Sequence, residues 1–420
     1  MVKTVLQWVK SRRSVLFFAW SCFSVGVLAH GQQLLTLDDA VREALESHPV
    51  LALESQRITS VGALVQQAGL RPNPRLFIQS ENWNFAGTTH IPVASTFTDQ
   101  FLYASQVLET GSKRQRRVEL AQENVRLTQL ERDILAQQIV SRVKQAYWSA
   151  VGAERIVALL KQSQQNLLQT IEYHEVQLRE GAIAEGDVVR VRLEGDRTNI
   201  ALENAERDVT SSKLALLREM GRETFADVRL VDSIDDQPPV PLIDIGQALE
   251  NRPDLRQARQ GIEQARAGVR LQQSIAKPDV EVLSGYKRTV GFNTFMWGVQ
   301  VPLPFFNKNQ GNIASAQSDV SVAESRVRAL EIQVKAEIEA AHRDAEARRQ
   351  RLAALVAGAL ARADESVTIA RAAYREGGTD LLRLLEAERI YIELEVLNAR
   401  MRMEYRQSLV TLETALGVGR

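Results

Sequence analysis

Two aspartates that follow glycine turns are the clearest candidates for chemistry in this sequence. Asp187 comes six residues after Gly181, and Asp380 comes directly after Gly377-Gly378-Thr379. A carboxylate at such a turn can accept hydrogen bonds from the free backbone amides that begin a helix, which contributes about 1 kcal/mol. The sequence therefore predicts that each aspartate caps a helix returning from its turn.

Catalytic motifs are absent from the sequence. It contains neither a G-x-x-x-x-G-K-[ST] phosphate loop nor a G-x-S-x-G nucleophile elbow. Mixtures of acidic and basic residues such as Glu131-Arg132-Asp133 are typical of solvated helix faces. We therefore predict no catalytic residues and no enzymatic activity.

Histidine and cysteine form no pattern of metal ligands. Beyond residue 31 the histidines are His48, His90, His174 and His342, without the short spacings of a zinc site. The single cysteine, Cys22, lies near the N-terminus. The sequence predicts no metal site and no cofactor.

The first 31 residues have the composition of a secretory signal peptide. Four basic residues precede an apolar run, which ends at the small residues of Ala29-His30-Gly31. The alternatives are a single membrane anchor, for which the apolar run is short, and lipidation of Cys22. Cleavage would remove four of the 52 basic residues and none of the 52 acidic ones, leaving a net charge near −4. No nucleic-acid partner is expected.

All eleven prolines lie between Pro49 and Pro92 or between Pro238 and Pro304. Because proline interrupts helices, the two proline-free tracts predict very long helices. The two proline-containing windows also begin alike, with Ala44-Leu45-Glu46-Ser47-His48-Pro49 and Ala248-Leu249-Glu250-Asn251-Arg252-Pro253. The chain is therefore predicted to be a duplication with a period of about 200 residues.

Each predicted repeat consists of a helix, a β-hairpin, a long helix and a return helix. The first repeat, 32–237, has a helix bent near Pro49, a hairpin at 75–109, a long helix at 113–180, a return helix at 187–220 and a linker. The second repeat, 238–420, has a helix at 244–276, a hairpin at 279–304, a long helix at 311–376 and a return helix at 380–416. At 1.5 Å per residue the first long helix spans about 100 Å, which predicts coiled-coil hairpins.

Both predicted hairpins alternate apolar and polar residues. Phe101 and Tyr103 share one side of their strand, as do Phe295 and Trp297 of theirs, and all four are predicted to face lipid. Four strands per chain cannot close a barrel, whereas three chains would supply twelve strands above a tube of helices. The alternative is a soluble hairpin that packs on the helices.

These features resemble the TolC family of outer-membrane efflux channels over nearly the whole chain. Within it, two segments are similar to the CzcC-like branch, which serves heavy-metal exporters of the resistance–nodulation–division (RND) type. They are Val301-Pro302-Leu303-Pro304-Phe305-Phe306-Asn307-Lys308-Asn309-Gln310-Gly311 and Ala373-Tyr374-Arg375-Glu376-Gly377-Gly378-Thr379-Asp380-Leu381-Leu382-Arg383.

The resemblance implies a homotrimer with a barrel in outer-membrane lipid and a helical tube in the periplasm. A periplasmic adaptor protein and an inner-membrane RND pump would be its partners, and heavy-metal cations its cargo. The runner-up within the family is the duct of a type I protein-secretion system. The rival outside the family is a soluble periplasmic coiled-coil scaffold.

The resemblance also assigns roles to the two glycine turns. Asp187, Asp380 and Tyr374 would lie near a closed channel constriction, and Arg383 stands where many relatives have an acidic residue. Carboxylates repeated around a narrow lumen would attract cations. The tip residues expected to contact the adaptor are Gly181, Ala182, Gly377 and Gly378.

Overall fold

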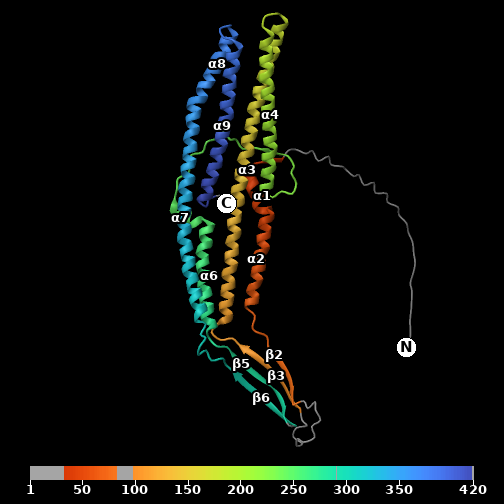
Figure 1. Ribbon diagram of the computed structural model, residues 1–420, viewed down its shortest axis with the longest axis vertical. Coiled ribbons are helices and arrows are strands. Elements are labelled where there is room, and N and C mark those ends of the chain that lie inside the picture. Colours follow the sequence, from red (N-terminus) through yellow and green to blue (C-terminus); the bar gives the residue numbers. More distant parts are fainter. Residues whose placement is uncertain (1–32, 83–97, 290, 419–420) are drawn as a thin grey trace, which may run out of the picture.

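The computed structural model describes residues 33–82, 98–289 and 291–418, so the predicted signal peptide lies outside the described residues. The described part is elongated, with a β-sheet at one end and the tips of two helical hairpins at the other (Figure 1). The predicted fold class, mainly α-helical with a small β part, is confirmed.

Both repeats have the same order of elements. The first contains α1 (Leu37–Ser47), α2 (Pro49–Ala68), β2 (Arg75–Glu81), β3 (Asp99–Leu108), α3 (Lys113–Arg179) and α4 (Glu185–Glu219). The second contains α5 (Ile245–Asn251), α6 (Pro253–Ile275), β5 (Val280–Thr289), β6 (Phe292–Gln300), α7 (Gln310–Ala354), α8 (Ala361–Arg375) and α9 (Leu381–Ala415). A π-helical stretch, Leu355–Leu360, joins α7 to α8, whereas α3 is uninterrupted.

The structure differs from the sequence prediction at several boundaries. The helix expected at 244–276 is two helices, because Arg252 is extended before Pro253, as residues preceding proline usually are. The return helix expected to begin at Asp187 begins at Glu185. A short parallel pair, β1 (Gln33–Leu35) with β4 (Val228–Leu230), was not predicted.

Each repeat has a matching turn at the end of its return helix, and this turn packs against the start of the helix that begins with proline. Each return helix ends in a left-handed glycine, Gly221 with φ of 79° and Gly417 with φ of 69°. A Cβ on Gly221 would lie 2.8 Å from Pro49 Cδ, and one on Gly417 would lie 3.0 Å from the Arg252 nitrogen. The duplicated sequence around each proline therefore packs against the end of its own return helix.

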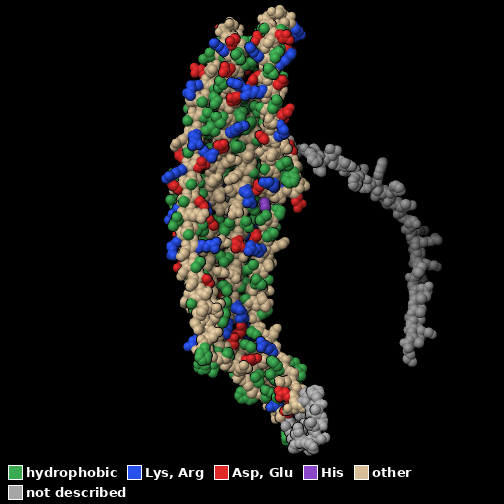
Figure 2. Space-filling model, viewed as in Figure 1, with side chains coloured by type: hydrophobic (Ala, Val, Ile, Leu, Met, Phe, Trp, Pro, Cys, Tyr) green, Lys and Arg blue, Asp and Glu red, His purple; other side chains and the backbone are tan. Residues whose placement is uncertain are grey.

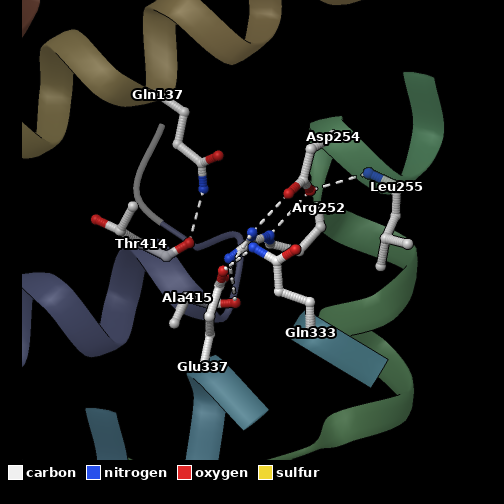
Figure 3. A network of polar contacts seen from close by, with 8 residues as sticks. All are labelled: Gln137, Arg252, Asp254, Leu255, Gln333, Glu337, Thr414 and Ala415. Carbon is white, nitrogen blue, oxygen red and sulfur yellow. Dashed lines mark hydrogen bonds and ion pairs between the residues drawn. The ribbon is translucent and has the colours of Figure 1, made fainter. Parts of the chain in front are cut away.

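Arg252 connects three helices of the second repeat through hydrogen bonds (Figure 3). Its guanidinium donates two hydrogen bonds to Asp254, at 2.9 and 2.6 Å, and one to Glu337 of α7 at 3.0 Å. It also donates to the carbonyl oxygen of Ala415 at 3.2 Å, which satisfies a free carbonyl at the end of α9. One largely buried cation thus ties α6, α7 and α9 together.

The four-stranded sheet joins the two repeats in the order β2-β3-β5-β6. Its central pair is formed by β3 and β5, one from each repeat. The strands β2 and β6 form the two edges, and neither has a second partner within the described chain.

Candidate functional site

The two helical hairpins, which are α3 with α4 and α8 with α9, have the same turn geometry at their tips. Gly181 and Gly377 adopt left-handed φ angles of 72° and 74°. The next residue closes each turn, with Ala182 N donating to Gln177 O at 2.9 Å and Gly378 N donating to Ala373 O at 2.7 Å. Both are Schellman turns, in which glycine avoids the steric cost of a Cβ. The four tip residues proposed from the sequence are all exposed.

The two aspartates beyond these turns have different roles. Asp380 is the N-cap of α9, and its Oδ1 accepts a hydrogen bond from Arg383 N at 2.9 Å. The prediction that Asp187 caps its helix is wrong, because the N-cap is Ala184 and Asp187 lies within the first turn of α4. There its carboxylate is 3.6 Å from the Arg190 guanidinium and favourably placed in the positive field of the helix N-terminus.

Both hairpins contribute to one cavity just below the tips. It has a volume of about 300 Å³ and brings Asp187 together with Asp380 and Tyr374. Its complete lining is His174, Ile183, Asp187, Arg190, Tyr374, Asp380, Leu381 and Leu382. A small apolar cluster that includes Leu167, Val191, Leu381 and Leu385 also connects the hairpins in this region.

His174 is the tip residue that sequence reasoning missed. Its side chain is only 1% exposed, and Nε2 lies 2.5 Å from the hydroxyl oxygen of Tyr374, on the other hairpin. The two rings stack at 25°, with centroids 5.8 Å apart. Burial raises the pKa of the Tyr374 hydroxyl, and the nearby Tyr173 and Asp187 add to this effect. A lone histidine on a helix gave no sign of a tyrosine partner 200 residues away.

Arg383 lies on the exposed side of the first turn of α9. No carboxylate of the described chain lies within ion-pair distance of its guanidinium.

The sheet presents two chemically different faces. Tyr286 lies between Leu102 and Phe295, which places all three on one face, whereas Lys287 lies between Phe101 and Thr294 on the other. We call the first the apolar face; it includes Leu76, Ile78, Leu102, Ala104, Val282, Ser284, Tyr286, Phe295, Trp297 and Val299. The polar residues Ser80, Gln100, Gln106, Arg288 and Asn293 lie on the same face, toward the ends of the strands. We call the second the mixed face; it includes Arg75, Phe77, Gln79, Phe101, Tyr103, Glu281, Lys287, Thr294 and Gln300.

The strand pairing shows that the four aromatic residues predicted to face lipid do not all lie on one face of the sheet. Phe101 and Tyr103 lie on the mixed face, so they cannot face the same environment as Phe295 and Trp297. Phe101 lies 5.1 Å from the ammonium of Lys287, and Tyr103 stacks on Phe77 with centroids 4.9 Å apart. The apolar face is strongly exposed, with Phe295 at 74% and Trp297 at 75%.

The described residues contain neither a metal-ligand group nor a helix that could span a membrane. Among the described residues, no three or more His, Cys, Asp or Glu side chains are grouped so that they could hold a metal ion. In the same residues, no helix combines the length and the hydrophobicity needed to cross a membrane.

The sequence matches one family model twice, over residues 40–222 and 245–418, and the description of that family is outer membrane efflux protein. The two matches correspond to the two structural repeats. They leave out the linker that contains β4.

Two curated proteins and one solved structure are similar over most of the chain. The cobalt-zinc-cadmium resistance protein CzcC of Cupriavidus metallidurans is 24% identical over 386 residues, which are 91% of this chain and 90% of CzcC. The nickel-cobalt-cadmium resistance protein NccC of Alcaligenes xylosoxydans xylosoxydans is 23% identical over 70% of this chain and 67% of its own length. The structure of CusC superposes with a TM-score of 0.72 at 19% identity, covering 91% of this chain and 92% of CusC.

Proposed function

The chain belongs to the outer membrane efflux protein family, and we propose that it forms the homotrimeric exit duct of a tripartite efflux system. Membership confirms the resemblance inferred from the sequence. It also confirms that the chain is a transport duct and not an enzyme.

The observation that carries this proposal is the separation of two surfaces to opposite ends of the molecule (Figure 1). At one end the apolar face of the sheet is exposed, and hydrophobic side chains gather there, whereas charged side chains are spread over the helices (Figure 2). At the other end are the two exposed hairpin tips. An apolar sheet face suits lipid, and the tips suit a periplasmic adaptor protein that links the duct to an inner-membrane RND pump.

The open edges of the sheet support a trimer. Among the described strands, β2 and β6 each pair with a neighbouring strand on one side only, and an open edge of a sheet is costly in a membrane. Pairing β2 of one copy with β6 of the next would close three sheets into a barrel of twelve strands. The mixed face would then line the lumen and the apolar face would contact outer-membrane lipid.

Heavy-metal cations are the proposed cargo. The sequence similarity to CzcC and NccC, together with the two segments that resemble the CzcC-like branch, supports this assignment. The duct is proposed to be a passive conduit, with substrate selection left to the pump. None of the contacts described here favours a type I secretion duct.

A fractionation experiment separates the duct from a soluble scaffold. Membranes of expressing cells are separated, extracted with detergent, and the mass of the purified oligomer is measured. A particle of three chains from the outer membrane would support the duct, and tolerance of cobalt, zinc and cadmium would then be compared in cells with and without the gene. If the protein is instead recovered in soluble form from the periplasm, the proposal is overturned, because the apolar face of its sheet would then not be in contact with lipid.

A further inference from the structure

The level at which the sheet meets the helices carries an excess of positive charge. Four connections between a helix and a strand, two from each repeat, lie at this level (Figure 1). With the adjoining residues they occupy 70–76, 106–117, 274–282 and 300–311. These four segments contain eight basic residues and three acidic ones, whereas the whole chain contains 52 of each. The excess is therefore local.

Hydrogen bonds hold the four connections in place. The Thr110 nitrogen donates to Oδ1 of Asp279 at 2.9 Å, which ties the first repeat to the second. The side-chain amide of Asn309 donates to the carbonyl oxygen of Gln272 at 2.8 Å, and the carbonyl oxygen of Pro72 accepts a hydrogen bond from a glutamine of β3 at 2.9 Å. We call the four segments together the junction collar.

The acidic side chains of the junction collar do not neutralise all of its cations. Glu109 pairs with Arg117, and Asp279 pairs with Lys113 at 2.7 Å. The third carboxylate, Glu281, lies on the mixed face of the sheet, which is the proposed lumen side. The other cations of the collar therefore depend on partners elsewhere.

Four exposed cations of the junction collar have no carboxylate within ion-pair distance in the part of the chain that the structure describes. They are Arg71, Arg114, Lys277 and Lys308. Clusters of uncompensated Lys and Arg next to a membrane are attracted to anionic lipid headgroups. The charge of the collar thus matches an anionic lipid surface.

Two phenylalanines of the junction collar are strongly exposed. Phe305 is 73% exposed and Phe306 is 94% exposed. In the sequence, the alternation that puts Trp297 on the apolar face continues through Leu303, which is 68% exposed, to Phe305. Exposed aromatic rings beside basic side chains are typical of protein surfaces that lie at the boundary of headgroups and acyl chains.

We propose that the junction collar binds anionic phospholipid headgroups in the leaflet that faces the helical end of the duct. The collar follows directly after the apolar face of the sheet, so headgroup contacts there continue the hydrocarbon contacts of that face. The proposal rests on the proposed duct function. It adds to that function a class of lipid and the residues that bind it.

The test is the equilibrium binding of labelled phosphatidylglycerol and labelled phosphatidylcholine to the purified full-length oligomer in detergent micelles. For wild type we expect phosphatidylglycerol to bind about fivefold more tightly at low salt, and this preference should fall as salt screens the charges. The triple variant Arg71→Gln, Lys277→Gln and Lys308→Gln should reduce the preference to below about twofold. Arg71→Lys with Lys277→Arg and Lys308→Arg keeps the charges and should keep the preference.

The matched control removes three exposed cations from α7 and α8, away from the junction collar. It combines Lys335→Gln, Arg351→Gln and Arg362→Gln, and it should keep the wild-type preference. A further variant, Phe305→Ser with Phe306→Ser, should weaken the binding of both lipids to the same extent, because the rings carry no charge.

Four outcomes would contradict the proposal, and they are distinguishable. Equal binding of the two lipids by wild type, or an unchanged preference in the triple variant, overturns the collar proposal while the duct stands. Displacement of phosphatidylglycerol by sodium phosphate beyond that by sodium chloride of equal ionic strength would identify a phosphate-ion site instead. If the phenylalanine variant separates into single chains, the rings belong to a contact between copies, and the collar proposal is overturned. If the protein needs no detergent and binds neither lipid, the duct function itself fails.

Discussion

Phe101 and Trp297 lie on opposite faces of the four-stranded sheet. Phe101 pairs with Lys287, which pairs with Thr294, whereas Trp297 pairs with Ser284 on the apolar face. The Lys287 ammonium lies over the Phe101 ring, and a charged ammonium is unsuited to the hydrocarbon of a membrane. The register therefore identifies Trp297, and not Phe101, as the aromatic side chain to test against lipid.

The first prediction compares arginine at these two positions. Trp297→Arg should cost about 2–4 kcal/mol if the side chain faces the middle of the bilayer, and should sharply reduce the trimer recovered from outer membranes. Phe101→Arg is the matched control, because it introduces the same side chain toward the proposed lumen, and it should assemble nearly normally. Equal recovery of the two variants would contradict the assignment of the faces.

The second prediction concerns the carboxylates at the tip. Asp187→Asn combined with Asp380→Asn should reduce the preference of the channel for cations, because three copies of each carboxylate would surround the constriction. Asparagine is a good N-cap, so α9 should keep its start. The reversal potential in a salt gradient measures the change. A value identical to that of wild type would mean that the carboxylates serve only their local contacts with Arg190 and the backbone.

The third prediction tests the tips as adaptor contacts. Ala182→Gln and Gly378→Gln place longer side chains on exposed turns, and a Cβ at Gly378 would lie 3.4 Å from its nearest neighbour, which the fold tolerates. Both should weaken co-purification with the cognate adaptor while the oligomer stays intact. The control is Gly261→Gln on α6, where a Cβ meets nothing within 4 Å. Normal adaptor binding by both tip variants would exclude these residues from the contact.

The fourth prediction is a loss of stability in acid through His48. Burial, and then the positive charge of Arg142, lower the pKa of His48 below its ordinary value of 6.5. Because the folded state resists protonation, its stability contribution is present above about pH 6.5 and is lost as pH falls through the lowered pKa. His48 is the N-cap of α2, and its Nδ1 accepts a hydrogen bond from Val50 N at 3.2 Å. Asparagine can also cap a helix but cannot titrate, so the melting temperature of His48→Asn should depend less on pH between about 7 and 5. If the melting temperatures of wild type and His48→Asn change equally with pH, this role of His48 is refuted.

The sequence by itself determined the helical architecture and the duplication. Helix starts and stops depend on short-range effects: Pro49 and Pro253 begin helices, Gly181 and Gly377 end them, and Asp380 accepts a hydrogen bond from Arg383 only three residues away. Such effects are complete within a few residues, so they can be predicted from a local pattern.

The tertiary structure decided the pairings between distant segments. Alternation in 99–108 and 292–300 indicates two faces for each strand, but only the pairing of β3 with β5 determines which of these faces coincide. A shift of one residue would exchange the faces, which is why the four aromatic residues were wrongly grouped. The His174–Tyr374 bond likewise depends on how two long hairpins lie against each other, and no local rule relates residues 200 positions apart.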